Sequence, residues 1–121
     1  MATAQDTRSL GDTIHEARKR AGMSLRELAG RIGINHSYVS DIENDRRVPS
    51  ERVLKALATQ LGLDFDELMA RAGRFGDKAD RYIRRHHLLG TLVRRIAEMN
   101  LDDFALKKLI NSAERLSKKT K

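Results

Sequence analysis

The stretch that decides the fold is residues 24–50, SLRELAGRIGINHSYVSDIENDRRVPS. Ser24 and Glu27 have the spacing of a capping box, in which each side chain satisfies a free backbone N–H of the other residue. Gly33 supplies a tight turn, and Asn35 can cap a second helix. The stretch therefore predicts two short helices, about 25–32 and 36–44, separated by a turn of about three residues.

Small and apolar positions within this stretch agree with a helix-turn-helix. Ala29 is small where the second helix must cross closely, and Ile34, Val39 and Ile42 are spaced to hold the two helices together. Because caps, turn glycine and apolar spacing all coincide, the pattern is a specific one. A generic helical bundle without DNA affinity is the simpler alternative.

Three further helices are predicted around this pair. One covers 9–21 and ends before Gly22, a second is capped by Ser50 and ends at Gly62, and a short third begins after Asp64 and ends near Gly73. The fold class is therefore all-α, with five helices inside residues 9–72.

These residues resemble the Cro/C1-type, or XRE-type, helix-turn-helix family of bacterial and phage regulators. The resemblance covers residues 9–72 and includes Ile42-Glu43 and Pro49-Ser50. It implies a lambda-repressor-like DNA-binding domain and a transcriptional regulator that binds double-stranded DNA. It also implies a structural ion pair between Arg18 of the first helix and Glu43 at the end of the third.

The DNA-contacting side of the third helix follows from its periodicity. At about 100° per residue, Val39 and Ile42 share one side, so polar residues occupy the other. Such a helix contacts bases mainly through its N-terminal residues. We expect base contacts from His36, Ser37 and Ser40, a phosphate or thymine-methyl contact from Tyr38, phosphate contacts from Asn44, Arg46 and Arg47, and a backbone-amide phosphate contact at Leu25 and Arg26.

Two positions in this set depart from the usual pattern. Leu25 stands where many members of the family have Gln, so only its amide contact is expected. Asp41 faces a polyanion, and we expect it to accept from a cytosine amino group or to pair with a nearby Arg.

Charge is divided unevenly along the 121 residues, whose formal net charge is +7. Residues 1–72 hold 11 basic and 11 acidic side chains, whereas residues 73–121 hold 13 basic and 6 acidic ones. For the basic segment from Arg81 to Arg95, a solvated surface is the simplest interpretation, contact with the DNA backbone the second, and an anionic partner or membrane the third.

The C-terminal part predicts a helical hairpin that self-associates. A flexible 1–8, a linker at 73–76, one long helix over about 77–99, a second helix capped by Asp102 and a frayed basic tail at 118–121 complete the expected organisation. Two such helices have more apolar face than each can cover, so a homodimer is expected through residues 77–117. The expected contacts are Leu89, Leu92, Val93, Ile96, Phe104, Leu106, Leu109, Ile110 and Ala113.

The segment LVRRIAEMNLDDFALKKLI, residues 92–110, resembles more loosely the small sporulation and biofilm regulators. That resemblance implies two helices that dimerise and engage a helical antagonist. An antitoxin-like protein whose hairpin binds a small antagonist or toxin protein is therefore the alternative to a homodimeric repressor. A non-specific nucleoid protein is a third hypothesis.

Other chemistries find no support in the sequence. Cysteine is absent, which excludes disulfides and thiolate metal sites and is typical of a reducing compartment. His86 and His87 are adjacent and point about 100° apart on a helix, so they do not form a metal site. No nucleophile elbow, phosphate loop, signal peptide or membrane span is recognisable, and we expect a cytoplasmic protein without cofactor, metal, membrane contact or enzymatic activity.

Overall fold

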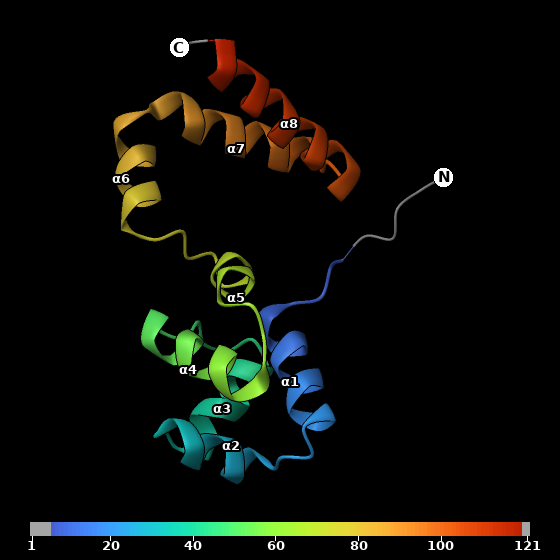
Figure 1. The fold of residues 1–121 in the computed structure, drawn as a ribbon, viewed down its shortest axis with the longest axis vertical. Coiled ribbons are helices and arrows are strands. Elements are labelled where there is room, and N and C mark those ends of the chain that lie inside the picture. The colour runs from blue at the N-terminus through green and yellow to red at the C-terminus, as the bar shows by residue number, and fades with distance from the viewer. Residues whose placement is uncertain (1–5, 120–121) are drawn as a thin grey trace. The chain divides into compact units, whose positions relative to one another are not determined.

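The structure is a computed structural model that describes residues 6–119, and all its regular elements are helices (Figure 1). Residues Arg8–Asp80 form one compact unit, and residues from Arg81 onward belong to another. The helices are α1 (Leu10–Arg20), α2 (Leu25–Ile32), α3 (His36–Glu43), α4 (Glu51–Leu61), α5 (Phe65–Arg71), α6 (Asp77–Arg85), α7 (His87–Met99) and α8 (Asp103–Lys119). The predicted all-α fold class is confirmed.

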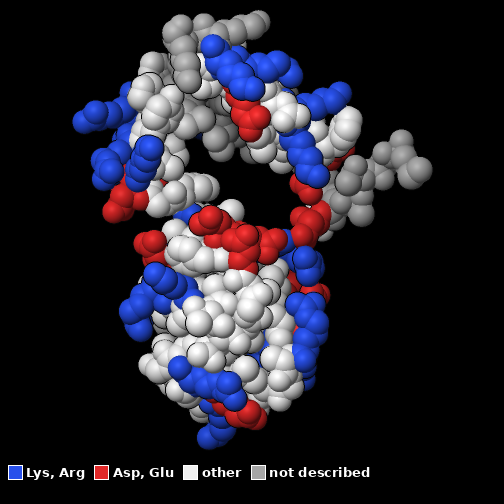
Figure 2. Space-filling model, viewed as in Figure 1, with Lys and Arg blue, Asp and Glu red and all other residues white. Residues whose placement is uncertain are grey.

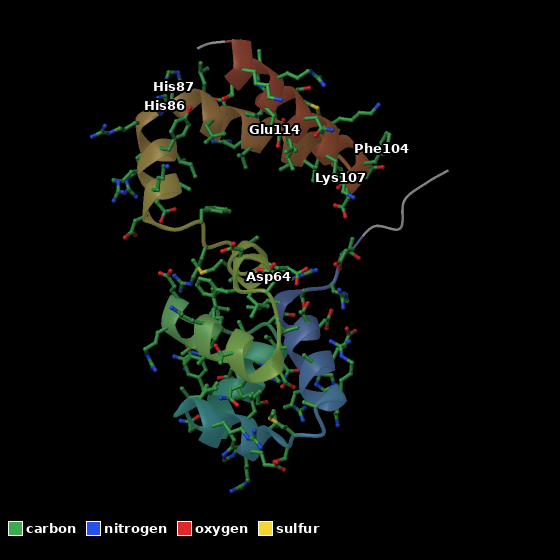
Figure 3. The ribbon with its side chains drawn as sticks, in the orientation of Figure 1. Asp64, His86, His87, Phe104, Lys107 and Glu114 are labelled. Atoms are coloured by element: carbon green, nitrogen blue, oxygen red, sulfur yellow. The ribbon has the colours of Figure 1, made fainter. Side chains whose placement is uncertain are left out.

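Each of the first five helices begins at a residue whose side chain accepts a hydrogen bond from a backbone N–H of the first turn. These residues are Ser9, Ser24, Asn35, Ser50 and Asp64. Asp64 is labelled at the start of α5 in Figure 3. Such a cap stabilises a helix by about 1 kcal/mol, so the sequence marks these starting points by local chemistry alone.

The predicted capping box at Ser24 is only half formed. Ser24 Oγ accepts from the Glu27 N–H at 3.1 Å, but within the described chain the Glu27 carboxylate makes no return bond to the Ser24 N–H. The full reciprocal arrangement occurs instead at the start of α1, between Ser9 and Asp12. Spacing alone therefore located the helix start but misassigned the second hydrogen bond.

The core of the first unit is made by apolar side chains from all five helices. Among the side chains that are fully buried are Ile14 of α1, Leu28 of α2, Ile42 of α3, Leu54 of α4 and Leu68 of α5. Burying a side chain of this size contributes about 1.5–3 kcal/mol each. Convergence on one core holds α2 and α3 in a fixed relative orientation.

Helix α1 approaches the end of α3 closely at Gly11. The Gly11 N–H donates to Asp45 Oδ1 at 2.9 Å, and a Cβ added to Gly11 would lie 2.7 Å from the Ile42 carbonyl oxygen. Asp45 itself has a positive φ of 58°, which is uncommon for a residue other than glycine. Only a glycine on α1 allows the two backbones to come this close.

The long helix predicted over 77–99 is wrong, because the chain breaks at His86 into α6 and α7. His86 has φ −126° and ψ 85°, outside the helical region. A continuous helix would still place Tyr82, Leu89 and Val93 on one side, so the apolar spacing does not signal this break.

Helices α7 and α8 are joined by residues 100–102, and Asp102 Oδ1 accepts from the Ala105 N–H at 2.9 Å, as a cap does. No residue of α6 or α7 is buried within the described chain. The expected hairpin packing of α7 on α8 stays a prediction.

The two chain ends differ from expectation where they are described. Helix α8 extends through Lys119, so residues 118 and 119 of the predicted frayed tail are helical, and residues 120–121 lie outside the described residues. Residues 1–5 of the predicted flexible N-terminus also lie outside them, whereas the Arg8 carbonyl accepts from Arg71 Nη1 at 2.8 Å. No helix within residues 6–119 has the length and apolarity needed to cross a membrane.

Candidate nucleic-acid interface

The turn between α2 and α3 has the geometry that the sequence predicts. Gly33 ends α2 in the left-handed region with φ 74°, and the Ile34 N–H donates to the Ala29 carbonyl at 3.1 Å. Val39 and Ile42 are fully buried, which fixes one side of α3 against the core. The other side of α3 is consequently turned outward, as a helix that enters the DNA major groove requires.

The start of α3 presents the side chains expected to contact bases. His36 and Ser37 are exposed, and Ser40 one turn later is half-buried. Asn35 Oδ1 accepts from the Tyr38 N–H at 2.8 Å and anchors this first turn. A shallow hollow lined by Ser24, Arg26 and His36, among others, connects the first turns of α2 and α3.

Tyr38 and Leu25 are half-buried and pack against the core rather than standing free. The Arg47 guanidinium lies 5.0 Å from the centre of the Tyr38 ring, which is a cation–π distance. Tyr38 therefore supports Arg47, and the exposed Arg26 lies beside Leu25 in the first turn of α2. The DNA contacts assigned to these four residues stay predictions.

Asp41 has the arginine neighbour that its position requires. Arg46 Nη1 lies 3.4 Å from Asp41 Oδ1, which offsets part of the negative charge on this side of α3. Asn44, expected to contact phosphate, donates from Nδ2 to the Ser40 carbonyl at 2.8 Å and so closes the end of α3. One amide proton of Asn44 is therefore engaged within the helix, although the residue is exposed.

Arg18 and Glu43 form the expected ion pair between α1 and α3. Arg18 Nε lies 2.7 Å from Glu43 Oε2 and Arg18 Nη2 lies 3.0 Å from Oε1, so the pair is bidentate, and both side chains are less than 10% exposed. Arg18 Nη1 also donates to the Met23 carbonyl at 2.9 Å. The pair is therefore buried and links α1 to the end of α3.

His15 is a third member of this group that the sequence analysis missed. His15 Nδ1 lies 2.7 Å from Glu43 Oε1, and the ring is about half exposed. Burial raises the pKa of Glu43, but the hydrogen bonds from Arg18 and His15 outweigh it, so the pKa lies below its ordinary value. The hydrogen bond to Glu43 raises the pKa of Arg18 despite burial. His15 lies one turn before Arg18 on α1, a spacing that could have revealed it.

The residues expected to form the dimer contact lie on α7 and α8, and none of them is buried. Val93 and Ile110 are 57% and 59% exposed, and Phe104 is 55% exposed. Leu92, Leu109 and Ala113 are exposed as well, while Leu89, Ile96 and Leu106 are half-buried. Leu88 and Leu116, which the predicted set omitted, are 72% and 62% exposed. This set of apolar side chains remains without a covering surface in the described chain.

The helix-turn-helix part of the chain is similar in sequence to known proteins. Residues 14–68 match the family model described as Helix-turn-helix. The ImmF control region 10 kDa protein of Bacillus phage phi105 is 36% identical over 63 residues, which cover 52% of this chain and 70% of the phage protein. The transcriptional regulator ClgR of Mycobacterium tuberculosis is 32% identical over 75 residues, covering 62% of this chain and 67% of ClgR.

A solved structure is similar over about half of the chain. The P22 c2 repressor protein, crystallised in complex with the synthetic operator 9T in the presence of Tl⁺, has a TM-score of 0.50 at 26% sequence identity. The match covers 51% of this chain and 94% of that chain. The matched family segment contains α2 and α3, the pair whose outward side is described above.

Proposed function

Because the chain belongs to the Cro/C1-type helix-turn-helix family and is a DNA-binding transcriptional regulator rather than an enzyme, we propose that it represses transcription as a homodimer on an inverted-repeat operator. The outward side of α3, with His36 and Ser37 exposed in its first turn, is the observation that supports sequence-specific binding. The proposal includes a cytoplasmic location, because the genome of a bacterium or its phage lies there.

One similar solved structure supports repression rather than activation. The P22 c2 protein is a repressor crystallised with an operator, and its match covers nearly all of that chain. A bound domain of this kind blocks polymerase by occupying its site. We therefore expect the regulated promoter to overlap the operator.

Homodimerisation is supported by the apolar side chains of α7 and α8. Ile110 and Val93, each more than half exposed, are costly to leave in water, since burying such a side chain contributes about 1.5–3 kcal/mol. A second copy of the chain offers the same apolar surface, so a two-fold contact covers both at once. Two α3 helices related by that axis would meet half-sites about 34 Å apart on one side of the duplex.

Selection from a random duplex pool tests the function directly. The full-length protein is incubated with the pool at physiological salt, and the bound fragments are sequenced. An enriched inverted repeat with half-sites about one helical turn apart is the expected result. An enriched site without two-fold symmetry would contradict the homodimer, and no enrichment would contradict sequence-specific regulation.

The oligomeric state is tested separately with Val93→Asp and Ile110→Asp. Each variant is expected to sediment as a monomer at concentrations where the wild-type protein is a dimer, because the substitution places a charge in the proposed contact. Glu98→Gln, on exposed α7 surface outside the expected contact, is the control and should remain dimeric. A wild-type monomer that co-purifies with a stoichiometric second protein would favour the antitoxin-like alternative.

A further inference from the structure

Three arginines form one row along α6. Arg81, Arg84 and Arg85 have the i, i+3, i+4 spacing that places side chains next to each other on one side of a helix, and all three are exposed. Figure 2 shows Lys and Arg side chains projecting from this helix. Ala79, Tyr82 and Ile83 lie on its other side.

Acidic groups balance this row only in part. Asp77 and Asp80 stand four residues before Arg81 and Arg84 on α6, whereas the residue four positions before Arg85 is Arg81. Within the described chain, neither carboxylate forms an ion pair with an arginine of the row. Between Asp80 and Glu98 the sequence holds five arginines and no Asp or Glu, so the end of α6 keeps an excess of exposed positive charge.

The end of α6 also carries two histidines. His86 stacks on Tyr82 with ring centroids 4.0 Å apart, and its Nδ1 lies 3.0 Å from the Tyr82 carbonyl. His86 and His87 are both exposed at the α6–α7 junction, where Figure 3 labels them. The stacked pair ends α6 directly after the arginine row, so the row occupies a defined helical segment.

Affinity for DNA needs cations that residues 1–72 do not supply in excess, because their 11 basic and 11 acidic side chains cancel. Within that segment Arg18 is buried on Glu43, and Arg46 lies beside Asp41. Phosphate contacts provide most of the sequence-independent part of DNA affinity. The whole excess of +7 lies in residues 73–121.

We propose that the Arg81–Arg84–Arg85 row binds backbone phosphates of duplex DNA and supplies a sequence-independent part of the affinity. The inference rests on the proposed function, because it assigns the same DNA a second set of contacts. Duplex DNA presents one negative charge per about 1.7 Å of its axis, which suits a row of closely spaced guanidinium groups. Residues 72–76 join α5 to α6, so the row is covalently linked by a short segment to the unit that contains α3.

The salt dependence of binding measures this contribution. Neutralising three phosphate contacts should lower the slope of log K against log salt by about 2.7 for each protomer bound. Between 50 and 200 mM salt, that difference corresponds to about a 40-fold smaller loss of affinity. We therefore compare the wild-type full-length chain with R81Q/R84Q/R85Q on a mixed-sequence 40-bp duplex, using fluorescence anisotropy at several salt concentrations.

Two matched variants isolate the row. K107Q/K108Q/R115Q removes the same net charge from α8 and should leave the slope within about one unit of the wild-type value. R81K/R84K/R85K keeps three cations on α6 and should retain the wild-type slope, because Lys contacts phosphate as a point charge. Circular dichroism of each variant checks helix content, which Gln preserves about as well as Arg.

Each possible result of the salt-dependence measurement either supports or contradicts the proposal. The expected slope loss in R81Q/R84Q/R85Q alone supports it. Equal losses in the α6 and α8 variants would mean that net charge and not this row is responsible, and an unchanged slope in the α6 variant would overturn the row while leaving the regulator intact. If wild-type protein binds phosphatidylserine vesicles but no duplex, both this proposal and the proposed function are wrong.

Discussion

Replacing Gly11 with Ala tests whether the approach of α1 to the end of α3 positions the DNA-contacting helix. An added Cβ would lie 2.7 Å from the Ile42 carbonyl oxygen and 2.8 Å from Asp45 Oδ1, and it would clash with the Glu43 carbonyl oxygen. Two of these atoms are backbone, so they cannot move aside by changing a rotamer. Helix α1 must shift away from α3, which also lengthens the 2.9 Å hydrogen bond from Gly11 to Asp45.

The magnitude follows from three opposing effects. Overpacking of this kind costs about 1–3 kcal/mol, and losing a hydrogen bond to a charged group costs about 1.5–3 kcal/mol. Ala gains up to about 1 kcal/mol over Gly in helix propensity. The net expectation is a loss of about 3 kcal/mol, near the middle of the range of about 1.5–5 kcal/mol that these figures leave, and it lowers Tm by about 12–24 °C for a domain of this size.

Thermal unfolding of the full-length chain, followed by circular dichroism, measures the effect. Gly30→Ala is the matched control, because Gly30 lies inside α2 with nothing within 4 Å of an added Cβ. That variant should be stabilised by up to about 1 kcal/mol through helix propensity alone. Equal stability of Gly11→Ala and wild type, or shifts of the same sign in both variants, would refute the role assigned to the close approach.

Two further predictions concern α3 and its support. Glu43→Gln should cost about 3 kcal/mol at pH 7, because it leaves Arg18 buried without its charge partner. Since the pKa of Glu43 is lowered, its contribution to stability is present above the ordinary pKa of a glutamate, about 4.3, and is lost as the pH falls through the lowered pKa. Urea unfolding should therefore show the stabilities of wild type and variant converging only at acidic pH, below that range. Ser37→Ala should lower discrimination at one base pair by about 1–3 kcal/mol, whereas Arg47→Ala should weaken binding to all sequences alike. A competition assay over single-base operator variants separates the two, and equal changes in both would contradict the assigned roles.

Much of the helix-turn-helix could be predicted because its signals are local. Helix α2 begins and ends where the sequence analysis placed it, since Ser24 caps it and Gly33 ends it within a few residues of chain. The exposed first turn of α3 follows from the burial of Val39 and Ile42, which their spacing indicates. The prediction of a hydrogen bond from the Ser24 N–H to the Glu27 carboxylate was wrong. Spacing indicates which groups can meet, but it does not determine which rotamer the side chain adopts.

The second unit was harder to predict for a related reason. At 100° per residue, Tyr82, Leu89, Val93 and Ile96 fall within about 60° of one another, so their spacing predicts one continuous stripe. This continuous pattern concealed the break at His86, where the backbone leaves the helical region. Counting matches to a helical period was not enough, because side-chain periodicity does not report a local break in the backbone.

The sequence by itself determined the five capped helices, the helix-turn-helix and the concentration of positive charge after residue 72, because each depends on residues within a few positions of one another or on composition. Only the tertiary structure decided that Gly11 meets Asp45 and that His15 joins Glu43. Those pairs are 34 and 28 residues apart, and their contact exists only because a common core packs α1 against α3. Local chemistry determines where the helices form, whereas burial of the core determines which side chains of different helices come into contact.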